Sequence, residues 1–316
     1  MNLKQQQGLL FLFNECDKIC ARLMCLSLTD VRVTMAVTMT TKEAEQMLHE
    51  IGDRDYCCQY VDDALRAPED VVLAFRGDEV LFCGESLPRL RDLAADIALR
   101  YLFNISGVRF FLAEEPVTES ETLHYEGVRS LRLLQPQWLA FAGMTGYHLA
   151  VWYGNNRFCG ACATPLEHKT SERALVCPNC GRVYYPNIAI AVIVGILDGD
   201  RILLSRYAAG AYRSYALIAG YVEIGETLED ALRREIMEEV GLNVKNIRFY
   251  DDQPWGFSRT LLVGFFADLD GPPDIVLDKR ELSEAVWVSR EEMPVSDPRI
   301  SMTAKMMEAF RLGEDV

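Results

Sequence analysis

The 316-residue sequence has little positive charge. Its 32 Lys and Arg residues are outnumbered by 47 Asp and Glu residues, which gives a formal net charge of −15. A broad phosphate-binding surface needs clustered Lys and Arg, so this balance argues against a long nucleic-acid footprint. It leaves open a local pocket that holds one nucleotide or the end of an RNA.

Long apolar runs are also missing. The most apolar early run, Leu9–Leu28, contains four charged residues, so it fails the requirement of about 20 residues nearly free of charge for a membrane span. The apolar run Gly8–Phe13 is short for a signal peptide and is followed by acids. We therefore expect a cytoplasmic protein with no membrane partner.

The chain is long for one domain, and half of its residues are apolar, which is enough for ordinary cores. We predict an N-terminal α+β domain over residues 1–153, a cysteine module over 154–186 and a catalytic domain over 187–316. The first of these shows no catalytic cluster. Its predicted strands are Val31–Val37, Val71–Phe75, Val80–Phe82 and Val108–Leu112, and its predicted helices are Arg89–Tyr101 and Gln135–Tyr153.

Four of the ten cysteines form two Cys-x-x-Cys pairs that are separated by fourteen residues. Each pair places two thiolates on a tight turn, and two such turns complete a tetrahedral site that suits zinc. No coordination position is left for water, so the site should be structural. Disulfides are the weaker alternative in a reducing cytosol. The predicted ligands are Cys159, Cys162, Cys177 and Cys180.

The two tyrosines that follow the last cysteine of the module, Tyr184 and Tyr185, have two possible roles. They could be ordinary packing residues. An aromatic ring on a rigid module is also a good stacking platform for a base.

The stretch Gly220–Leu242 combines a glycine-containing loop with a helix. Thr227, followed three residues later by Asp230, predicts the start of that helix. Gly241 lies where helices often end in a left-handed residue. The apolar positions with helical spacing, which predict one buried stripe, are Leu228, Ala231, Leu232 and Ile236.

Three carboxylates crowd the end of this helix. Glu235 and Glu239 are four residues apart and so share a face, and Glu238 flanks them. Like charges near a helix C-terminus oppose the macrodipole and one another. Oxygen ligands at this density suit Mg²⁺ or Mn²⁺, which in turn bind phosphate oxygens. The alternative is a solvated, charged helix face. We also expect Arg234 to reach back to Glu226.

The whole stretch resembles the signature of the Nudix hydrolases. The matching positions are Gly220, Glu226, Arg234, Glu235, Ile236, Glu238, Glu239, Gly241 and Leu242. This resemblance implies a Nudix domain, an α/β/α sandwich with a mixed sheet, that hydrolyses a nucleoside diphosphate linked to another group. The predicted strands are Ile188–Leu197, Arg201–Ser205, Val244–Tyr250, Thr260–Ala267 and Ala285–Val288, and Thr303–Leu312 is the predicted closing helix.

A second array, Asp252–Thr260, narrows the resemblance to the NADH pyrophosphatase branch, whose members carry a zinc ribbon and the sequence SQPWPFPxS. Residues that match are Gln253, Pro254, Trp255 and Phe257. Residues that depart are Asp252, Gly256, Ser258 and Thr260, in place of Ser, Pro, Pro and Ser. These departures loosen the loop and add an acid.

The resemblance also implies roles for single residues. Glu235, Glu238 and Glu239 would hold two or three Mg²⁺ or Mn²⁺ ions, with Glu281 and the carbonyl of Ala219 as further ligands. Either Glu239 or Glu281 would take the proton of the attacking water. The implied substrate-binding residues are Glu172, Tyr185, Tyr221, Gln253, Pro254, Trp255, Gly256, Phe257, Ser258, Arg259, Thr260 and Ala304.

In this branch NAD(H) is cut into nicotinamide mononucleotide and AMP, and NAD caps are removed from RNA 5′ ends by cutting the same bond. The branch commonly forms homodimers, so we expect a homodimer. One alternative is a Nudix pyrophosphatase that acts on ADP-ribose or dinucleoside polyphosphates. The other is a non-catalytic NAD-binding regulator, against which the intact cluster of glutamates argues.

Overall fold

The computed structural model describes residues 47–209, 214–297, 299 and 301–314. These residues form two compact units. The N-terminal unit comprises Leu48–Ile188 together with Trp255–Arg259, and the C-terminal unit comprises Met47, Ala189–Pro254 and the residues from Thr260 onward. The predicted strand Val31–Val37 lies outside the described residues. No described helix combines the length and apolar composition that crossing a membrane requires.

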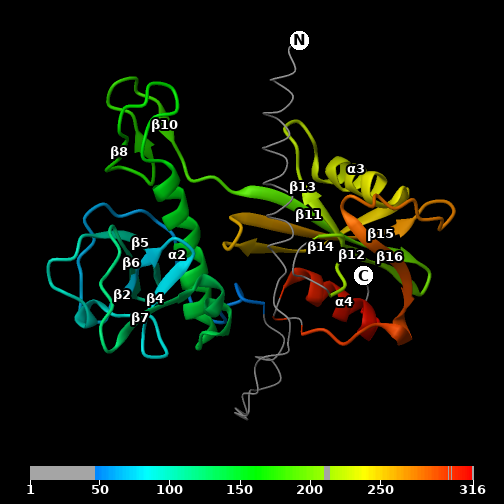
Figure 1. Ribbon diagram of the computed structural model, residues 1–316, viewed down its shortest axis with the longest axis horizontal. Helices are drawn as coiled ribbons and strands as arrows, with labels where there is room; N and C mark the ends of the chain where they lie inside the picture. The colour runs from blue at the N-terminus through cyan, green and yellow to red at the C-terminus, as the bar shows by residue number, and fades with distance from the viewer. Residues whose placement is uncertain (1–46, 210–213, 298, 300, 315–316) are drawn as a thin grey trace. The chain divides into compact units, whose positions relative to one another are not determined.

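The N-terminal unit is rich in strands and has one long helix (Figure 1). One sheet has the order β1-β5-β6-β2, and a second sheet has the order β3-β4-β7. The strand bounds are β1 Tyr56–Cys57, β2 Val71–Leu73, β3 Phe75–Arg76, β4 Glu79–Cys83, β5 Leu99–Ile105, β6 Val108–Ala113 and β7 Leu123–Gly127. Helix α2 spans Gln137–Asn155, and the 3₁₀ helices η1 and η2 span Leu90–Asp92 and Val128–Leu133. The predictions of strands at β2, β4 and β6 and of the helix at α2 are confirmed.

The predicted helix Arg89–Tyr101 is wrong. The chain makes only the 3₁₀ turn η1, in which Arg89 N donates to the Asp92 carboxylate at 2.8 Å, and it continues into strand β5. The apolar side chains that suggested a helix, Leu90, Leu93 and Ile97, pack against the sheet from an irregular segment. Pairing of β5 with β6 then places the end of the predicted helix in a sheet. Tertiary packing therefore overrides the helical periodicity.

The cysteine module forms a small antiparallel sheet, β10-β9-β8, within the N-terminal unit. Its strands are β8 Glu167–His168, β9 Leu175–Val176 and β10 Val183–Tyr184. Strands this short bury little apolar surface, so the module needs another source of stability.

The C-terminal unit is built on a six-stranded mixed sheet in the order β14-β15-β11-β12-β16, with β13 also paired to β11. The pairing of β11 with β15 is parallel, whereas β12 and β13 pair antiparallel with β11. The bounds are β11 Ala189–Asp198, β12 Arg201–Tyr207, β13 Ile218–Tyr221, β14 Val244–Trp255, β15 Thr260–Leu269 and β16 Leu282–Ser289. The five predicted strands of this region are confirmed.

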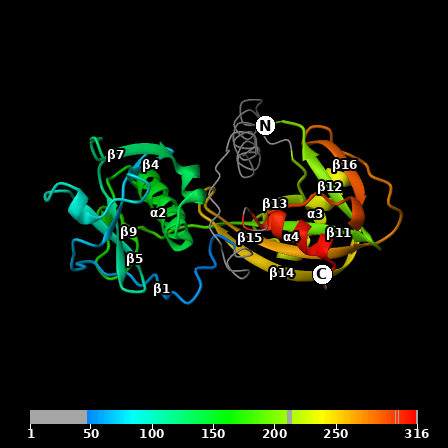
Figure 2. The same cartoon turned by 90° about the horizontal axis from the view of Figure 1, so that it is seen from below.

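Helices α3 (Leu228–Val240) and α4 (Met302–Leu312) cover opposite faces of this sheet. Val192 and Val194 of β11 belong to the core cluster that includes the apolar side of α3, whereas Ile193 belongs to the cluster that includes α4. Alternate residues of a strand point to opposite faces, so this division shows a sheet between two helices. Figure 1 shows the two helices on either side of the sheet, and Figure 2 shows the sheet from the side of α4. The predicted α/β/α sandwich is confirmed, as is the closing helix.

Candidate active site

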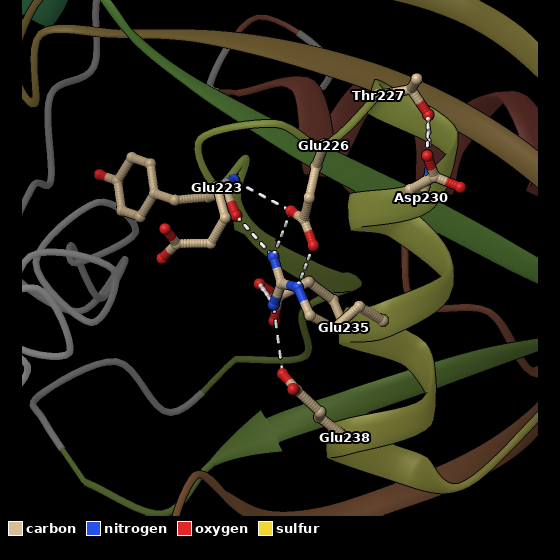
Figure 3. Close-up of polar contacts among 8 residues, drawn as sticks. Glu223, Glu226, Thr227, Asp230, Glu235 and Glu238 are labelled. Carbon is tan, nitrogen blue, oxygen red and sulfur yellow. Dashed lines mark hydrogen bonds and ion pairs between the residues drawn. The ribbon is translucent and has the colours of Figure 1, made fainter.

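Helix α3 begins and ends where the sequence predicts. The Thr227 hydroxyl accepts a hydrogen bond from Asp230 N at 3.1 Å, and Figure 3 shows the two side chains at the start of the helix. Gly241 ends the helix in the left-handed conformation with φ +67°. Ala231, Leu232 and Ile236 are fully buried, which confirms the apolar stripe. Glu239 is buried on the same side as these apolar residues, whereas Asp230, Arg233 and Glu238 are exposed.

Gly220 lies in strand β13, paired with Val192, and not in the loop that the sequence suggested. The loop proper begins after Tyr221. A Cβ atom on Gly220 would lie 1.9 Å from Cδ of Glu235, so the carboxyl group of Glu235 occupies the space that any larger residue would fill. The requirement for glycine is thus close packing against an acid rather than flexibility. Ala219 precedes Gly220 in the same strand.

Arg234 connects the loop to the carboxylates of the helix. Its guanidinium donates to both oxygens of Glu226, at 2.6 and 2.9 Å, which confirms the predicted contact. It also donates to Tyr221 O at 2.9 Å, to Glu235 at 2.7 Å and to Glu238 at 3.2 Å (Figure 3). The hydrogen bonds from Arg234, together with one from Glu223 N, lower the pKa of Glu226 to about 2. A bidentate pair of this kind fixes the loop relative to the helix.

Glu239 is the most deeply placed of the three helix glutamates, with 4% of its surface exposed. Burial raises its pKa well above the usual value, and the charges of Glu235, Glu281 and Asp278 raise it further. Burial also raises the pKa of Glu235, and neighbouring Glu238 and Glu281 add to that effect. Glu238 has 59% of its side chain exposed. The fold therefore brings Glu281 within electrostatic reach of the helix glutamates.

This set of oxygens fits a hard divalent cation. Carboxylates that repel one another gain stability when a cation lies between them, and Mg²⁺ and Mn²⁺ prefer carboxylate ligands. Arg234 contacts Glu235 and Glu238, but Glu239 shows no such contact in the described structure and is instead surrounded by acids. The donor chemistry thus supports metal binding by the predicted residues.

Asp278 was not among the predicted site residues. Its backbone N donates to Glu239 O at 2.9 Å, and its charge contributes to the raised pKa of Glu239. The sequence offers only its place three residues before Glu281 as a signal. Its proximity depends on how a loop packs against the end of α3.

The predicted substrate-binding residues of the C-terminal unit lie on four elements, β13, β14, β15 and α4. Gln253 in β14 is 1% exposed, and its Oε1 accepts from Met302 N at 2.9 Å, at the start of α4. Ala304 lies in the first turn of that helix. Tyr221 and Thr260 have their hydroxyl oxygens 3.5 Å apart. Pro254 is exposed in β14.

The remaining predicted residues of the array belong to the N-terminal unit and form a compact turn. Trp255 and Phe257 pack edge to face with ring centroids 5.3 Å apart. A Cβ atom on Gly256 would lie 2.4 Å from Met144 O, so the proline of the related array cannot be accommodated without movement. Within the turn, Ser258 N donates to Trp255 O and Arg259 N donates to Gly256 O. The departure at Gly256 therefore matches the local packing.

Glu172 and Tyr185 lie together in the N-terminal unit. The Tyr185 hydroxyl donates to Glu172 at 3.3 Å, and Lys169 forms an ion pair with the same carboxylate. Tyr185 is 56% exposed, so its ring is accessible to a ligand. Tyr184, in contrast, donates its hydroxyl to Cys159 Sγ at 3.3 Å and accepts from Gly160 N at 2.9 Å. Tyr184 thus braces the cysteine cluster.

The four cysteines of the module converge as predicted. Their sulfur atoms all lie within 4.8 Å of one another. Contacts from the hydroxyl and the backbone of Thr164 lower the pKa of Cys162 to about 5, which favours the thiolate that binds zinc. Four sulfur ligands at such distances fit tetrahedral zinc and leave no open position.

Both sites lie in segments that match known domain models. Residues 187–310 match the model of the NUDIX domain, and residues 155–185 match that of the NADH pyrophosphatase zinc ribbon domain. The chain therefore carries a Nudix domain preceded by this zinc ribbon. It is 40% identical over 163 residues to the NAD-capped RNA hydrolase NudC of Salmonella heidelberg and 42% identical over 164 residues to that of Klebsiella pneumoniae. Each alignment covers 52% of this chain and 63% of the relative.

Proposed function

We propose that the protein is a metal-dependent hydrolase that cuts the diphosphate bond of NAD(H) to give nicotinamide mononucleotide and AMP. The observation that carries this proposal is the buried Glu239, which lies among the charges of Glu235 and Glu281 on a Nudix domain. The similarity to NAD-capped RNA hydrolases supports the choice of substrate and extends it to the NAD cap of an RNA 5′ end.

In this mechanism Glu235, Glu238 and Glu239 hold Mg²⁺ or Mn²⁺, together with Glu281 and the carbonyl of Ala219. When bound, the metals neutralise charge on the diphosphate oxygens and make water more acidic. Glu239 or Glu281 accepts the proton of the attacking water. Burial favours the protonated state that results at Glu239, whereas Glu281 is exposed. Arg234 keeps the loop and the helix carboxylates in register.

Substrate recognition in the proposal falls to aromatic and polar residues. Tyr185, Tyr221, Trp255 and Phe257 stack on or enclose the base and the nicotinamide ring. The hydrogen-bonding groups and the remaining pocket positions come from Glu172, Gln253, Pro254, Gly256, Ser258, Arg259, Thr260 and Ala304. We also propose a cytoplasmic homodimer, and domains with the boundaries 1–153, 154–186 and 187–316.

The departures from the related array favour one second candidate, a Nudix pyrophosphatase for ADP-ribose or dinucleoside polyphosphates. Asp252 adds a negative charge, and Gly256 packs where proline does not fit. Such changes alter which dinucleotide the pocket accepts and leave the metal site intact.

A substrate panel tests the proposal. The full chain, with Mg²⁺ or Mn²⁺, is given NADH, NAD-capped RNA, ADP-ribose and diadenosine polyphosphates, and the products are resolved by chromatography. The proposal expects the highest kcat/KM for NADH or capped RNA. A higher kcat/KM for ADP-ribose or a diadenosine polyphosphate establishes the second candidate. Binding of NAD without turnover of any substrate establishes a non-catalytic regulator.

A further inference from the structure

The segment between β15 and β16 is fastened along the C-terminal end of α3. The last carbonyls of a helix have no partner within the helix and need donors from elsewhere. Here Val276 N donates to Val240 O at 2.9 Å, and Asp278 N donates to Glu239 O at 2.9 Å. Asp270 N donates to Asn243 O at 2.8 Å, just beyond the helix. The backbone that carries Glu239 is thus joined directly to the backbone of Asp278.

Asp278 also builds the turn that follows. Its Oδ1 accepts from Arg280 N at 2.9 Å, and its Oδ2 accepts from Arg280 Nη2 at 2.6 Å. Its carbonyl accepts from Glu281 N at 3.2 Å and from Leu282 N at 3.0 Å. An aspartate that bonds a backbone N–H two residues later stabilises a tight turn. The single residue Asp278 therefore accepts hydrogen bonds from Arg280, Glu281 and Leu282.

The position of Glu281 is held from the other side as well. Its carbonyl accepts from Ala208 N at 2.8 Å, and the next residue, Leu282, is fully buried in the core cluster under α3. The charge of Glu281 acts on both Glu235 and Glu239. The turn thus presents a carboxylate from a different element to the acids of the helix.

The ion pair between Arg280 and Asp278 does not by itself explain why this turn forms. The side chain of Arg280 is 87% exposed, whereas that of Asp278 is 16% exposed. An exposed pair of this kind contributes little to stability. What the shielded aspartate provides is the backbone geometry between Glu239 and Glu281.

We propose that Asp278 is a positioning residue that holds the Glu281 carboxylate beside Glu239 through the turn it forms with Arg280 and through its backbone bond to α3. The inference rests on the proposed function in that Glu281 contributes to the metal site. It adds a residue that does not itself contact metal or substrate.

The test separates the turn from the charge. Asp278→Asn keeps an oxygen that accepts from Arg280 N and loses the charge, whereas Asp278→Glu keeps the charge and loses the two-residue turn. We expect Asp278→Glu and Asp278→Ala to weaken Mn²⁺ binding about tenfold, as loss of an orienting partner does, and Asp278→Asn to bind Mn²⁺ almost as the unchanged protein does. Mn²⁺ binding is followed by electron paramagnetic resonance, without substrate.

A matched control comes from the same chain. Asp297 accepts from Arg299 N at 3.0 Å and from its guanidinium, so it makes the same bond to an N–H two residues later. Within the described residues none of its hydrogen bonds reaches α3. Asp297→Ala should leave Mn²⁺ binding unchanged. Circular dichroism verifies that each variant is folded, and the comparison of the Asn and Glu variants stands even when Asp278→Ala does not fold.

A double-mutant cycle identifies the residue through which Asp278 acts. In a Glu281→Gln background, Asp278→Glu should weaken Mn²⁺ binding no further. A further loss of the same size, or equal binding by Asp278→Glu and the unchanged protein, overturns the inference. Absence of Mn²⁺ binding in the unchanged protein overturns both the metal site and the inference. Mn²⁺ binding without NADH hydrolysis overturns only the proposed reaction.

Discussion

The zinc ribbon and the end of helix α3 both gather potential metal ligands, but they do so in opposite ways. The four cysteines converge within 4.8 Å, and Tyr184 and Thr164 brace them from outside. The glutamates are held by Arg234 on one side and by burial on the other, and Glu239 remains among like charges. The first arrangement is complete and closed, as a structural site is. In the second, the charges of the carboxylates repel one another, and a bound cation would relieve that repulsion.

The largest expected effect is at the ribbon. Structural zinc contributes about 10–16 kcal/mol in small zinc-binding peptides at pH 7, and the three short strands of the ribbon bury little else. We expect Cys177→Ser to lose zinc and to make residues 159–180 sensitive to protease. Zinc content and mass spectrometry of the proteolytic fragments measure this result. Cys83→Ser, at a half-buried cysteine outside the cluster, is the control, and a protease-resistant ribbon without zinc contradicts the account.

We expect the fold around the acidic site to depend on close packing at Gly220 rather than on a bound metal. Gly220→Ala places a methyl group within 1.9 Å of the Glu235 carboxyl carbon. Overpacking of this kind costs about 1–3 kcal/mol, so the variant should lose stability and should also displace an expected metal ligand. Thermal unfolding and Mn²⁺ binding measure the two losses. Gly127→Ala, where a Cβ meets nothing within 4 Å, should change neither of them.

Because Glu239 is buried among like charges, we predict that removing its charge stabilises the metal-free protein. The pKa of Glu239 is raised in the native state, so the native state binds a proton more tightly than the unfolded state does. The free energy of unfolding therefore falls as pH rises above the unfolded pKa of about 4.3. Glu239→Gln removes this loss and should raise Tm at neutral pH, by about 2–4 °C for each kcal/mol recovered.

The pH dependence sharpens that prediction. The gain in Tm from Glu239→Gln should shrink as pH falls toward the unfolded pKa, because Glu239 is then protonated in both states. Glu238→Gln, at the exposed neighbour, should give no comparable gain. If metal-free Glu239→Gln has a lower Tm than the unchanged protein at neutral pH, repulsion at Glu239 does not destabilise the fold. Calorimetry in a metal-free buffer measures the Tm of the unchanged protein and of both variants.

The smallest expected effect is on stability alone. It comes from removing the hydrogen bond that caps α3 while leaving the glutamates of that helix unchanged. Thr227→Ala removes the hydrogen bond to Asp230 N and should cost about 1 kcal/mol, as the loss of other N-caps does. Ser301→Ala at α4 removes the equivalent bond to Ala304 N and should cost a similar amount. Denaturant unfolding measures both losses. Thr227→Ala should bind Mn²⁺ as the unchanged protein does wherever the variant is folded. Weaker Mn²⁺ binding by the folded variant contradicts this separation.

What the sequence could predict depends on local interactions. The cap at Thr227, the left-handed Gly241 and the contact between Arg234 and Glu226 lie within one loop and helix, and all three are confirmed. The convergence of the cysteines follows from two turns with known geometry. Spacing along the chain was sufficient for each of these features.

The features that the sequence did not predict depend on tertiary contacts. The apolar spacing of Arg89–Tyr101 is the same in a helix as in an irregular segment that packs against a sheet, and only the pairing of β5 with β6 distinguishes them. Gly220 lies in a strand because β13 pairs with β11. Asp278 joins the acidic site through a loop bonded to the end of α3. None of these long-range contacts is visible in residue spacing.

The most direct test of the central claim is hydrolysis of NADH by the unchanged protein and by Glu239→Gln, side by side, with Mg²⁺ or Mn²⁺. The account predicts AMP and reduced nicotinamide mononucleotide from the unchanged protein. It predicts a loss in kcat of about 10²–10⁴-fold in the variant, the range of a lost acid–base group. Equal rates for the two proteins would contradict the assigned role of Glu239. Absence of turnover of both NADH and ADP-ribose by the unchanged protein would contradict the enzyme itself.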